Sequence, residues 1–363
     1  MSTQQQKALF LESKCGQFAV RATAIPEPSA DEVLIRVEAS ALNPSDWKIQ
    51  QFGMVVEEFP TILGWDAAGT IVTVGSAIQD QFAVGDRVIV QGWFTNGGRS
   101  ARGTYRQYLA ARPETVAKIP QDFPFETAAS LPSGLVTAAF SLFNEKAVPF
   151  ISLYDGKESS SSAKLTPSWE ARGRGLYAGK PIFVLGGAST VGQFVIQLAR
   201  LAGFAPVITT ASLHNVKYLQ SLGATHVLER TVGQGHLQAE IMRIAGGPLA
   251  LVYDAISRDE SFALSYGVTA PTGQLIIVSP GVFSAENPKT VHLANGLFSS
   301  PVNKDVGAGL RMHLKGLLEA GDVKPLRIEV LPGGLGGVVA GLARMRDGKV
   351  SGVKLVVRPQ ETE

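Results

Sequence analysis

Residues 183–200 have the sequence FVLGGASTVGQFVIQLAR, in which a group of small residues separates an apolar strand from an amphipathic helix. Such a turn lets the backbone approach a pyrophosphate closely, and the N-terminus of the following helix offers N–H groups and the positive end of its dipole. The pattern carries a serine, Ser189, at the place of a further glycine, and a plain strand–helix turn looks similar. The flanking strand and helix favour a dinucleotide site. Its predicted phosphate contacts are Gly186, Gly187, Ala188, Ser189, Thr190, Val191 and Gly192.

Strand and helix patterns alternate from residue 180 to residue 278. Five apolar runs have the length of buried strands, and four segments between them have apolar residues at helical spacing. The predicted strands cover residues 181–185, 206–210, 226–228, 249–253 and 274–278, and the predicted helices cover 191–202, 215–222, 236–244 and 262–268. Alternation of this length predicts a parallel, doubly wound sheet.

The first third of the chain has the pattern of short β-strands. Residues 32–41 alternate apolar and polar side chains, as a half-buried strand does. Similar runs separated by glycine-containing turns predict a compact, barrel-like domain. The further expected elements are strands over 61–74, 86–90, 104–110, 115–119 and 354–357, helices over 126–144 (broken at 132–134), 307–320 and 336–347, and an exposed serine-rich loop over 154–176.

The bulk composition excludes several classes of protein. The 363 residues are enough for two or three domains, and the net charge of +2 gives no reason to expect a nucleic acid or an anionic membrane as partner. Cys15 is the single cysteine, so an intramolecular disulfide and a cysteine-rich zinc site are excluded. The polar start MSTQQQKALFLESK lacks the apolar stretch of a secretory signal, and no run is long enough to span a bilayer. We therefore expect a cytoplasmic protein.

The end of the second predicted strand, residues 209–215, indicates which dinucleotide binds. A site for NAD usually has Asp or Glu here to accept bonds from the ribose hydroxyls, and this segment has neither. A 2′-phosphate needs neutral or cationic donors without a repelling carboxylate. The predicted donors are Ser212, His214, Asn215, Lys217 and Arg230, and they favour NADPH over NADH. For Lys217 and Arg230, a solvated helix face and a strand end are the alternatives.

Several motifs together resemble the medium-chain dehydrogenase/reductase superfamily over nearly the whole chain. They are ALNPSDWK, GWDAAGTIVTVG, GDRV, ASLPSGLVTA, the glycine turn, SLGATHVL and SGVKLVV. Within the quinone-oxidoreductase and enoyl-reductase branch, the chain is similar to the fungal trans-acting enoyl reductases of polyketide synthesis. The resemblance implies a GroES-like β-barrel catalytic domain over residues 1–135, a Rossmann cofactor domain over 136–300 that contains the exposed loop 154–176, and a C-terminal return to the catalytic domain over 301–363.

The same resemblance argues against zinc. The zinc alcohol dehydrogenases of the superfamily carry a cysteine after the early strand and a Gly-His-Glu motif, whereas this chain has Asn43-Pro44 and Gly64-Trp65-Asp66 in these regions. Trp65 cannot bind a metal, and the five histidines include no pair at ligand spacing. We expect a zinc-free site.

Without a Lewis acid, conjugate reduction is easier than direct alcohol–ketone redox chemistry, because hydrogen-bond donors can stabilise the developing enolate. The family pattern places Lys48 and Thr137 near the nicotinamide, and we predict both as catalytic residues. There is an alternative for each residue. Lys48 can be a solvated loop lysine, and Thr137 can be a helix threonine bonded to its own backbone. The further cofactor contacts that the resemblance implies are Ser45, Asp46, Lys48, Val278, Ser279, Val353 and Lys354.

The leading hypothesis is an NADPH-dependent reductase of an α,β-unsaturated carbonyl, with a small-molecule or acyl-thioester substrate. A polyketide synthase is the partner that the resemblance implies. The alternatives are an NADPH quinone oxidoreductase and a non-catalytic NADPH-binding sensor or interaction module. Many relatives dimerise through an edge strand of the cofactor sheet, but Pro280, at the end of a predicted strand, cannot donate to a ladder. A monomer is favoured over a homodimer.

Overall fold

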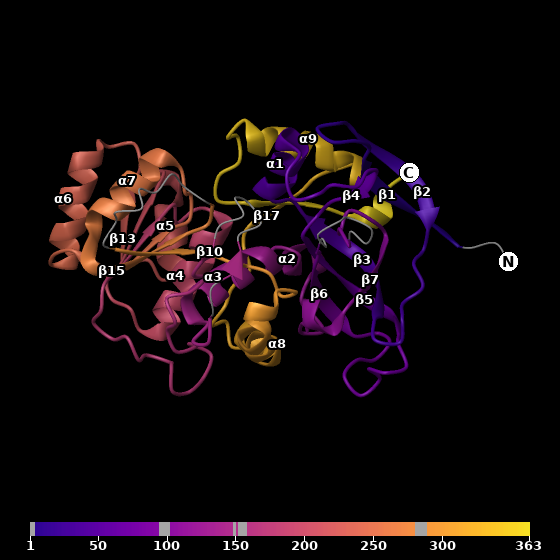
Figure 1. Ribbon diagram of the computed structural model, residues 1–363, viewed down its shortest axis with the longest axis horizontal. Coiled ribbons are helices and arrows are strands. Elements are labelled where there is room, and N and C mark those ends of the chain that lie inside the picture. Colours follow the sequence, from indigo (N-terminus) through magenta and orange to yellow (C-terminus); the bar gives the residue numbers. More distant parts are fainter. Residues whose placement is uncertain (1–3, 94–101, 148–149, 152–157, 280–288) are drawn as a thin grey trace. The chain divides into compact units, whose positions relative to one another are not determined.

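The computed structural model describes residues 4–93, 102–147, 150–151, 158–279 and 289–363, and its chain divides into two compact units (Figure 1). Unit 1 consists of Met1–Ser133 and Pro325–Glu363, and unit 2 of Gly134–Lys324. The last boundary lies at residue 325 rather than at the expected 301. The reason is helix α8 (Lys304–Glu319), which follows a segment bonded to unit 2. Asn144 of unit 2 donates from Nδ2 to Val302 O at 2.7 Å.

Unit 1 is built on a mixed seven-stranded sheet and a smaller three-stranded sheet. The large sheet has the order β17-β18-β3-β5-β6-β8, with β7 also paired to β3, and the small one has the order β2-β1-β4. The strands are β1 (Gln5–Leu11), β2 (Phe18–Ala24), β3 (Val33–Ala41), β4 (Thr61–Ile62), β5 (Asp66–Val74), β6 (Arg87–Gln91), β7 (Tyr108–Ala111), β8 (Val116–Lys118), β17 (Ile328–Val330) and β18 (Lys354–Val357). Apolar residues of β3, β5 and β6 face one another in its core.

Helix α1 (Pro44–Phe52) in unit 1 was not among the predicted elements. Only Asp46 and Ile49 of its nine residues are buried, so the segment has too few apolar residues to show helical periodicity. Its end signals are nevertheless present in the sequence. Asn43 and Asp46 form a capping box, Pro44 occupies the first turn, and Gly53 ends the helix with a φ of 61°. Unit 1 also contains α2 (Phe125–Ala128) and α9 (Gly337–Arg346).

Unit 2 is built on a six-stranded parallel sheet with the order β13-β12-β11-β14-β15-β16. Its strands are β11 (Ile182–Leu185), β12 (Val207–Ala211), β13 (His226–Glu229), β14 (Leu249–Asp254), β15 (Thr269–Ile277) and β16 (Thr290–Leu293), and the short β9 (Phe150–Ile151) pairs with β10 (Glu158–Ser159). Its helices, besides α8, are α3 (Pro132–Phe143, which begins in unit 1), α4 (Thr190–Ala202), α5 (Val216–Leu222), α6 (Gln234–Ala245) and α7 (Asp259–Val268). The order confirms the predicted doubly wound sheet.

The serine-rich segment differs from the exposed loop expected over 154–176. Residues 154–157 lie outside the described residues, as does Pro280, but Ser162, Ser168 and Trp169 are buried. Ser162 Oγ accepts the N–H groups of Asn144 and Lys164 at 3.1 and 3.0 Å. The prediction of exposure was wrong for residues 161–163 and 167–169, because hydroxyl groups that bond neighbouring backbone can be buried at little cost, whereas residues 171, 172 and 174–176 are exposed as expected.

Two other features complete the comparison with the expected elements. The helical region 126–144 is interrupted between α2 and α3, and Pro132 begins α3 rather than breaking it, since proline is tolerated in the first turn. Among the described residues, no helix combines the length and apolar character required to cross a membrane.

Candidate functional site

The glycine turn between β11 and α4 requires glycine at three of its positions. Gly186 has a φ of 79°, in the left-handed region. A Cβ atom on Gly187 would lie 2.2 Å from Thr209 Oγ1, and one on Gly192 would lie 2.4 Å from Gly186 O. Gly192 therefore packs on the backbone of Gly186, and Gly187 packs on the side chain of Thr209, so neither position has room for a side chain.

Ser189 explains why the pattern lacks a further glycine. It is the N-cap of α4 with extended backbone, and its Oγ accepts the N–H of Gly192 at 3.1 Å. The helix leaves the N–H groups of Thr190 and Val191 in its first turn without intrahelical acceptors. A tight glycine turn followed directly by a helix N-terminus, whose first N–H groups lack intrahelical acceptors, fits the pyrophosphate of a dinucleotide.

Two consecutive side-chain hydrogen bonds, from residues of α4 and α5, support this turn. Gln193 is buried, and its Nε2 donates to Ala188 O at 3.0 Å. Tyr218 OH in turn donates to Gln193 Oε1 at 2.7 Å. The middle of the glycine turn is thus fixed by a residue that sequence reasoning did not select.

The predicted donors at the end of β12 differ in their exposure to solvent. His214, Lys217 and Arg230 are exposed, and Ser212 is half-buried. Asn215 is fully buried, with its Nδ2 3.0 Å from His214 Nε2. Asn215, a predicted donor to the cofactor phosphate, is therefore buried and contacts His214.

Glu229 is an acidic residue at this place that sequence reasoning missed. It ends β13 and lies in register with Ala211, the last residue of β12. Its Oε2 accepts the Leu213 N–H at 3.1 Å, and its Oε1 accepts the Thr231 hydroxyl at 3.1 Å. The acid-free stretch 209–215 consequently has a carboxylate beside it, supplied by the neighbouring strand.

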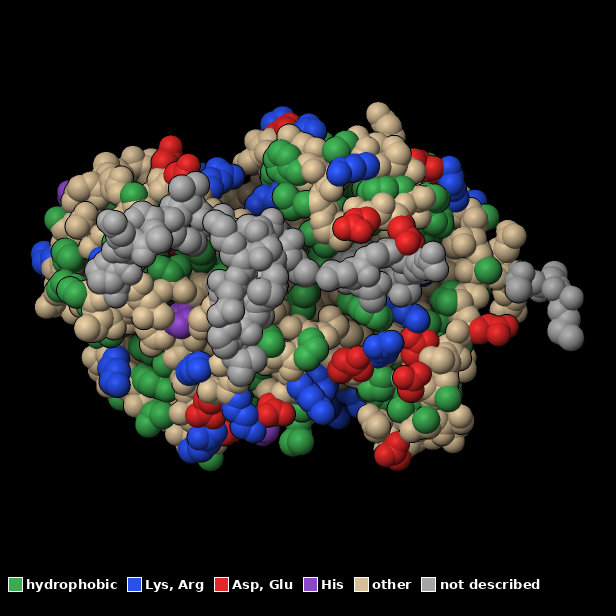
Figure 2. Space-filling view, in the orientation of Figure 1, with side chains coloured by type: hydrophobic (Ala, Val, Ile, Leu, Met, Phe, Trp, Pro, Cys, Tyr) green, Lys and Arg blue, Asp and Glu red, His purple; other side chains and the backbone are tan. Residues whose placement is uncertain are grey.

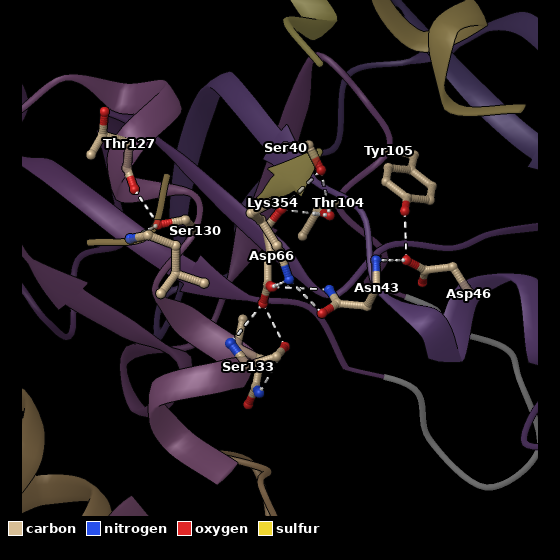
Figure 3. Close-up of polar contacts among 12 residues, drawn as sticks. Ser40, Asn43, Asp46, Asp66, Thr104, Tyr105, Thr127, Ser130, Ser133 and Lys354 are labelled. Carbon is tan, nitrogen blue, oxygen red and sulfur yellow. Dashed lines mark hydrogen bonds and ion pairs between the residues drawn. The ribbon is translucent and has the colours of Figure 1, made fainter. Parts of the chain in front are cut away.

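Asp66 is the centre of a buried polar network in unit 1 (Figure 3). Lys354 Nζ lies 2.9 Å from Asp66 Oδ2 and 2.6 Å from Asn43 Oδ1, and the Asn43 amide donates to the same carboxylate. Ser133 donates to Asp66 Oδ1 from both its N–H and its hydroxyl. The Lys354 side chain is about as buried as Asp66, at 1% and 0% exposed. In unit 1, its ammonium therefore neutralises an internal carboxylate.

Asp46 forms a second part of this network (Figure 3). Its Oδ2 accepts the Tyr105 hydroxyl at 2.6 Å and the Asn43 N–H at 2.8 Å. Burial and, to a smaller extent, the nearby Asp66 raise the pKa of Asp46, the Tyr105 and Asn43 bonds and Lys354 lower it, and the net pKa is about 7. Burial also raises the pKa of Tyr105. Asp46 thus caps α1 from inside unit 1.

The remaining predicted residues lie in both units. Lys48 and Ser45 are half-buried on α1 of unit 1, and Lys48 Nζ is 6.0 Å from the centre of the Trp47 ring. Val353 is half-buried just before β18. Thr137 of unit 2 is half-buried on α3, and its carbonyl accepts the Ser141 hydroxyl at 2.6 Å. Their roles stay predictions.

Thr137 lies against the backbone of Gly296 in unit 2. A Cβ on Gly296 would be 2.0 Å from Thr137 Oγ1, so the two segments are in close contact. Asn303 Nδ2 donates to Asn295 O at 2.7 Å and thereby fixes the segment that carries Gly296. A larger residue at 296 would displace the Thr137 hydroxyl.

In unit 2, Val278 and Ser279 follow β15 and are half-buried. The Val278 N–H donates to Ser257 Oγ at 2.8 Å. Among the described residues, no three His, Cys, Asp or Glu side chains are grouped as metal ligands would be. On the face in Figure 2, basic and acidic side chains are interspersed. This face shows no patch of one charge such as nucleic acid binding requires.

The comparisons with known proteins agree with this architecture. Residues 29–121 match the family model described as "Alcohol dehydrogenase GroES-like domain", and residues 190–301 match the one described as "Zinc-binding dehydrogenase". The trans-enoyl reductase himH of Aspergillus japonicus is 33% identical over 339 residues, which are 92% of this chain and 91% of that protein. The chain belongs to the enoyl reductase family of the medium-chain dehydrogenase/reductases.

A second named enoyl reductase and a solved structure are also similar to the chain. The trans-enoyl reductase resD of Aspergillus sclerotiorum is 30% identical over 352 residues, which are 90% of this chain and 92% of resD. An alcohol dehydrogenase superfamily protein from Novosphingobium aromaticivorans has a TM-score of 0.76 at 24% identity, with 97% and 99% of the two chains covered. The predicted combination of a GroES-like domain and a Rossmann sheet is confirmed, and membership makes the chain an oxidoreductase with a nicotinamide cofactor.

Proposed function

We propose that this protein uses NADPH to reduce the carbon–carbon double bond of an α,β-unsaturated carbonyl compound without zinc. The observation that carries the reaction class is the identity of 30–33% over at least 90% of the chain to relatives named trans-enoyl reductases. The glycine turn supports the cofactor class, because its glycines pack too tightly against neighbouring residues to carry side chains and a helix N-terminus follows directly, as in dinucleotide sites.

NADPH is proposed over NADH because His214, Lys217 and Arg230 are exposed around the end of β12. Glu229 opposes this preference, since a carboxylate repels a 2′-phosphate. Direct titration tests the balance: NADPH is expected to bind more tightly than NADH, and Glu229→Gln is expected to widen the difference. Equal affinities of the unsubstituted protein for the two cofactors would refute the preference.

Zinc independence is supported by the surroundings of Asp66. The Lys354 ammonium already supplies a positive charge to this carboxylate, and Asn43 supplies an amide where a metal site needs a stronger ligand. Activity is therefore expected to survive dialysis against EDTA, with no stoichiometric zinc in elemental analysis. Loss of activity that zinc restores would contradict this part of the proposal.

The proposed chemistry needs two additions to the double bond. Bound NADPH supplies a hydride for the carbon β to the carbonyl, and the α-carbon then takes a proton from water or a side chain. Lys48 and Thr137 are proposed to donate hydrogen bonds to the cofactor or to the substrate oxygen, which stabilises the developing enolate. Ser45, Asp46, Val278, Ser279, Val353 and Lys354 are proposed to contact or support the cofactor.

The test is NADPH oxidation measured in parallel with a simple enone, an enoyl-coenzyme A and a quinone. The proposal expects turnover of at least one of the first two at a higher kcat/KM than the quinone. Faster turnover of the quinone would make the protein a quinone oxidoreductase. NADPH binding without turnover of any of the three would favour a sensor or interaction module.

We further propose that the acyl group is delivered in trans by a polyketide synthase, the partner that the family resemblance implies; the relatives are themselves named trans-enoyl reductases. The same enoyl group on coenzyme A and on an acyl carrier protein separates free from carrier-bound recognition. A higher kcat/KM for the carrier-bound form is expected. Equal values for the two forms would leave a reductase without carrier specificity.

A further inference from the structure

The turn that follows β14 in unit 2 is fixed by one buried carboxylate. Asp254 is fully buried, and its Oδ1 accepts the N–H groups of Ile256 and Ser257 at 2.9 and 2.8 Å. Its Oδ2 accepts the hydroxyl of Ser261 at 2.8 Å. These bonds hold the chain in one conformation as it leaves the sheet.

Ser257 adopts a backbone conformation in this turn that is costly for a residue with a Cβ. Its φ is 52°, in the left-handed region where glycine is favoured. Its hydroxyl donates to Asp254 O at 2.9 Å and accepts the N–H of Val278 at 2.8 Å. Glycine would relieve the strain but would offer Val278 no acceptor. The hydroxyl therefore links the turn to the residue that follows β15.

The other side of the same turn packs on the glycine turn. Ala255 N–H donates to Leu185 O at 3.1 Å, at the end of β11. The Ile256 side chain lies over Gly186, because a Cβ there would be 2.5 Å from Ile256 Cγ1. The residues at 254–257 thus connect the carboxyl ends of β11 and β15, the two strands beside β14.

We propose that Ser257 is a positioning residue for the nicotinamide half of the cofactor, which it serves by fixing the backbone of Val278 relative to the glycine turn. This rests on the proposed function, in which Val278 and Ser279 contact or support the cofactor, and it assigns that contact to the nicotinamide half. Without the hydroxyl, the Val278 N–H loses its fixed acceptor, and the segment has to be ordered when the cofactor binds.

The test compares two ligands by calorimetric titration: NADPH and 2′-phospho-ADP-ribose, which lacks the nicotinamide. Ser257→Ala and Ser257→Gly both remove the hydroxyl, but only the glycine variant relieves the strain at φ 52°. Each variant is expected to bind NADPH about fivefold more weakly, the effect of one hydrogen bond, and the fragment within about twofold of the unsubstituted protein. Thr225→Ala is the matched control, because it also removes a hydroxyl that accepts one backbone N–H and donates to one carbonyl, both of Val207, at the amino end of β12.

Kinetics give a second readout. Both Ser257 variants are expected to lower kcat with saturating NADPH, whereas Thr225→Ala should keep it. Unchanged NADPH affinity in both variants, or equal weakening of NADPH and the fragment, would overturn the positioning role. Recovery in the glycine variant alone would also overturn it, since strain and not the hydroxyl would then be responsible. If the unsubstituted protein failed to bind NADPH, the proposed function itself would be refuted, and this proposal with it.

Discussion

Asp46 gives unit 1 a titration near neutral pH. Its Oδ1 is buried without a hydrogen-bond partner among the described residues, and the groups that face its carboxyl are Tyr105, Asn43, Asp66 and Lys354. Its pKa of about 7 in the folded chain lies far above the value of about 4 in an unfolded one. Between these values the folded state binds more protons, so the free energy of unfolding falls as pH rises and levels off above pH 7.

Urea unfolding at pH 5, 6, 7 and 8 tests whether the free energy of unfolding falls as pH rises. The reference is the Asp46→Asn variant, which cannot titrate at this position. The stability of the unsubstituted protein relative to the variant is expected to decline by a few kcal/mol from pH 5 to pH 8, because ionising the buried carboxyl is costly. A difference that stays constant over this range would show that Asp46 does not titrate there.

Lys48 is the residue whose replacement tests the proposed catalytic site in unit 1. Lys48→Ala is expected to reduce turnover at least about tenfold, which corresponds to roughly 1.4 kcal/mol in the barrier. Lys349→Ala is the control, because the Lys349 side chain is 69% exposed and pairs with Asp347 on the surface. The measurement is the steady-state turnover rate with saturating NADPH. An unchanged rate for Lys48→Ala would remove Lys48 from the proposed catalytic site.

The sequence allowed the identity of several site residues to be predicted but not their partners. Lys354 was selected through a resemblance, yet its bond to Asp66 joins residues 288 positions apart and needs the folded sheet to be seen. Glu229 was missed for a similar reason. It belongs to the next strand, and only the β12–β13 register brings it to Ala211.

At the scale of elements, the glycine turn could be predicted because local spacing alone determines it. Strand, turn and helix are consecutive there, and the apolar periodicity of α4 is strong. Helix α1 could not be found from periodicity, since it buries few side chains. The buried serine segment was also missed, because polar composition predicts exposure and says nothing about the backbone groups that satisfy hydroxyls.

The shape of the glycine turn makes a prediction for cofactor binding. Gly187→Ala and Gly192→Ala would each force a Cβ to within 2.5 Å of a neighbouring atom, so each is expected to weaken NADPH binding at least about tenfold. Gly235→Ala is the matched control, because nothing lies within 4 Å of its Cβ position. Titration with NADPH is the measurement, and binding by Gly187→Ala at the level of the control would contradict the close-approach argument.

At the scale of the whole molecule, the chain completes unit 1 with its last residues. Strand β18 pairs with β3 through Val356 and Ala41, and β17 pairs with β18, so the C-terminal segment extends a sheet that the first third began. The resemblance led us to expect this return. Its starting point was misplaced because α8 continues the helical character of unit 2, and sequence patterns do not show which core a helix joins.

The edge of the six-stranded sheet carries the last prediction, which concerns the oligomeric state. Strand β16 is at that edge, and its outer side is met by Ser160, which forms a parallel bridge with His292. Leu293 N–H donates to Ser160 O at 2.9 Å, and the Ser160 hydroxyl lies 2.9 Å from His292 Nδ1. A covered edge cannot pair with a second sheet, so the protein is expected to sediment as a monomer at micromolar concentration. Replacing residues 158–163 by a glycine–serine linker of equal length uncovers β16 and is expected to promote dimers. A dimer of the unsubstituted protein in sedimentation velocity would contradict the prediction.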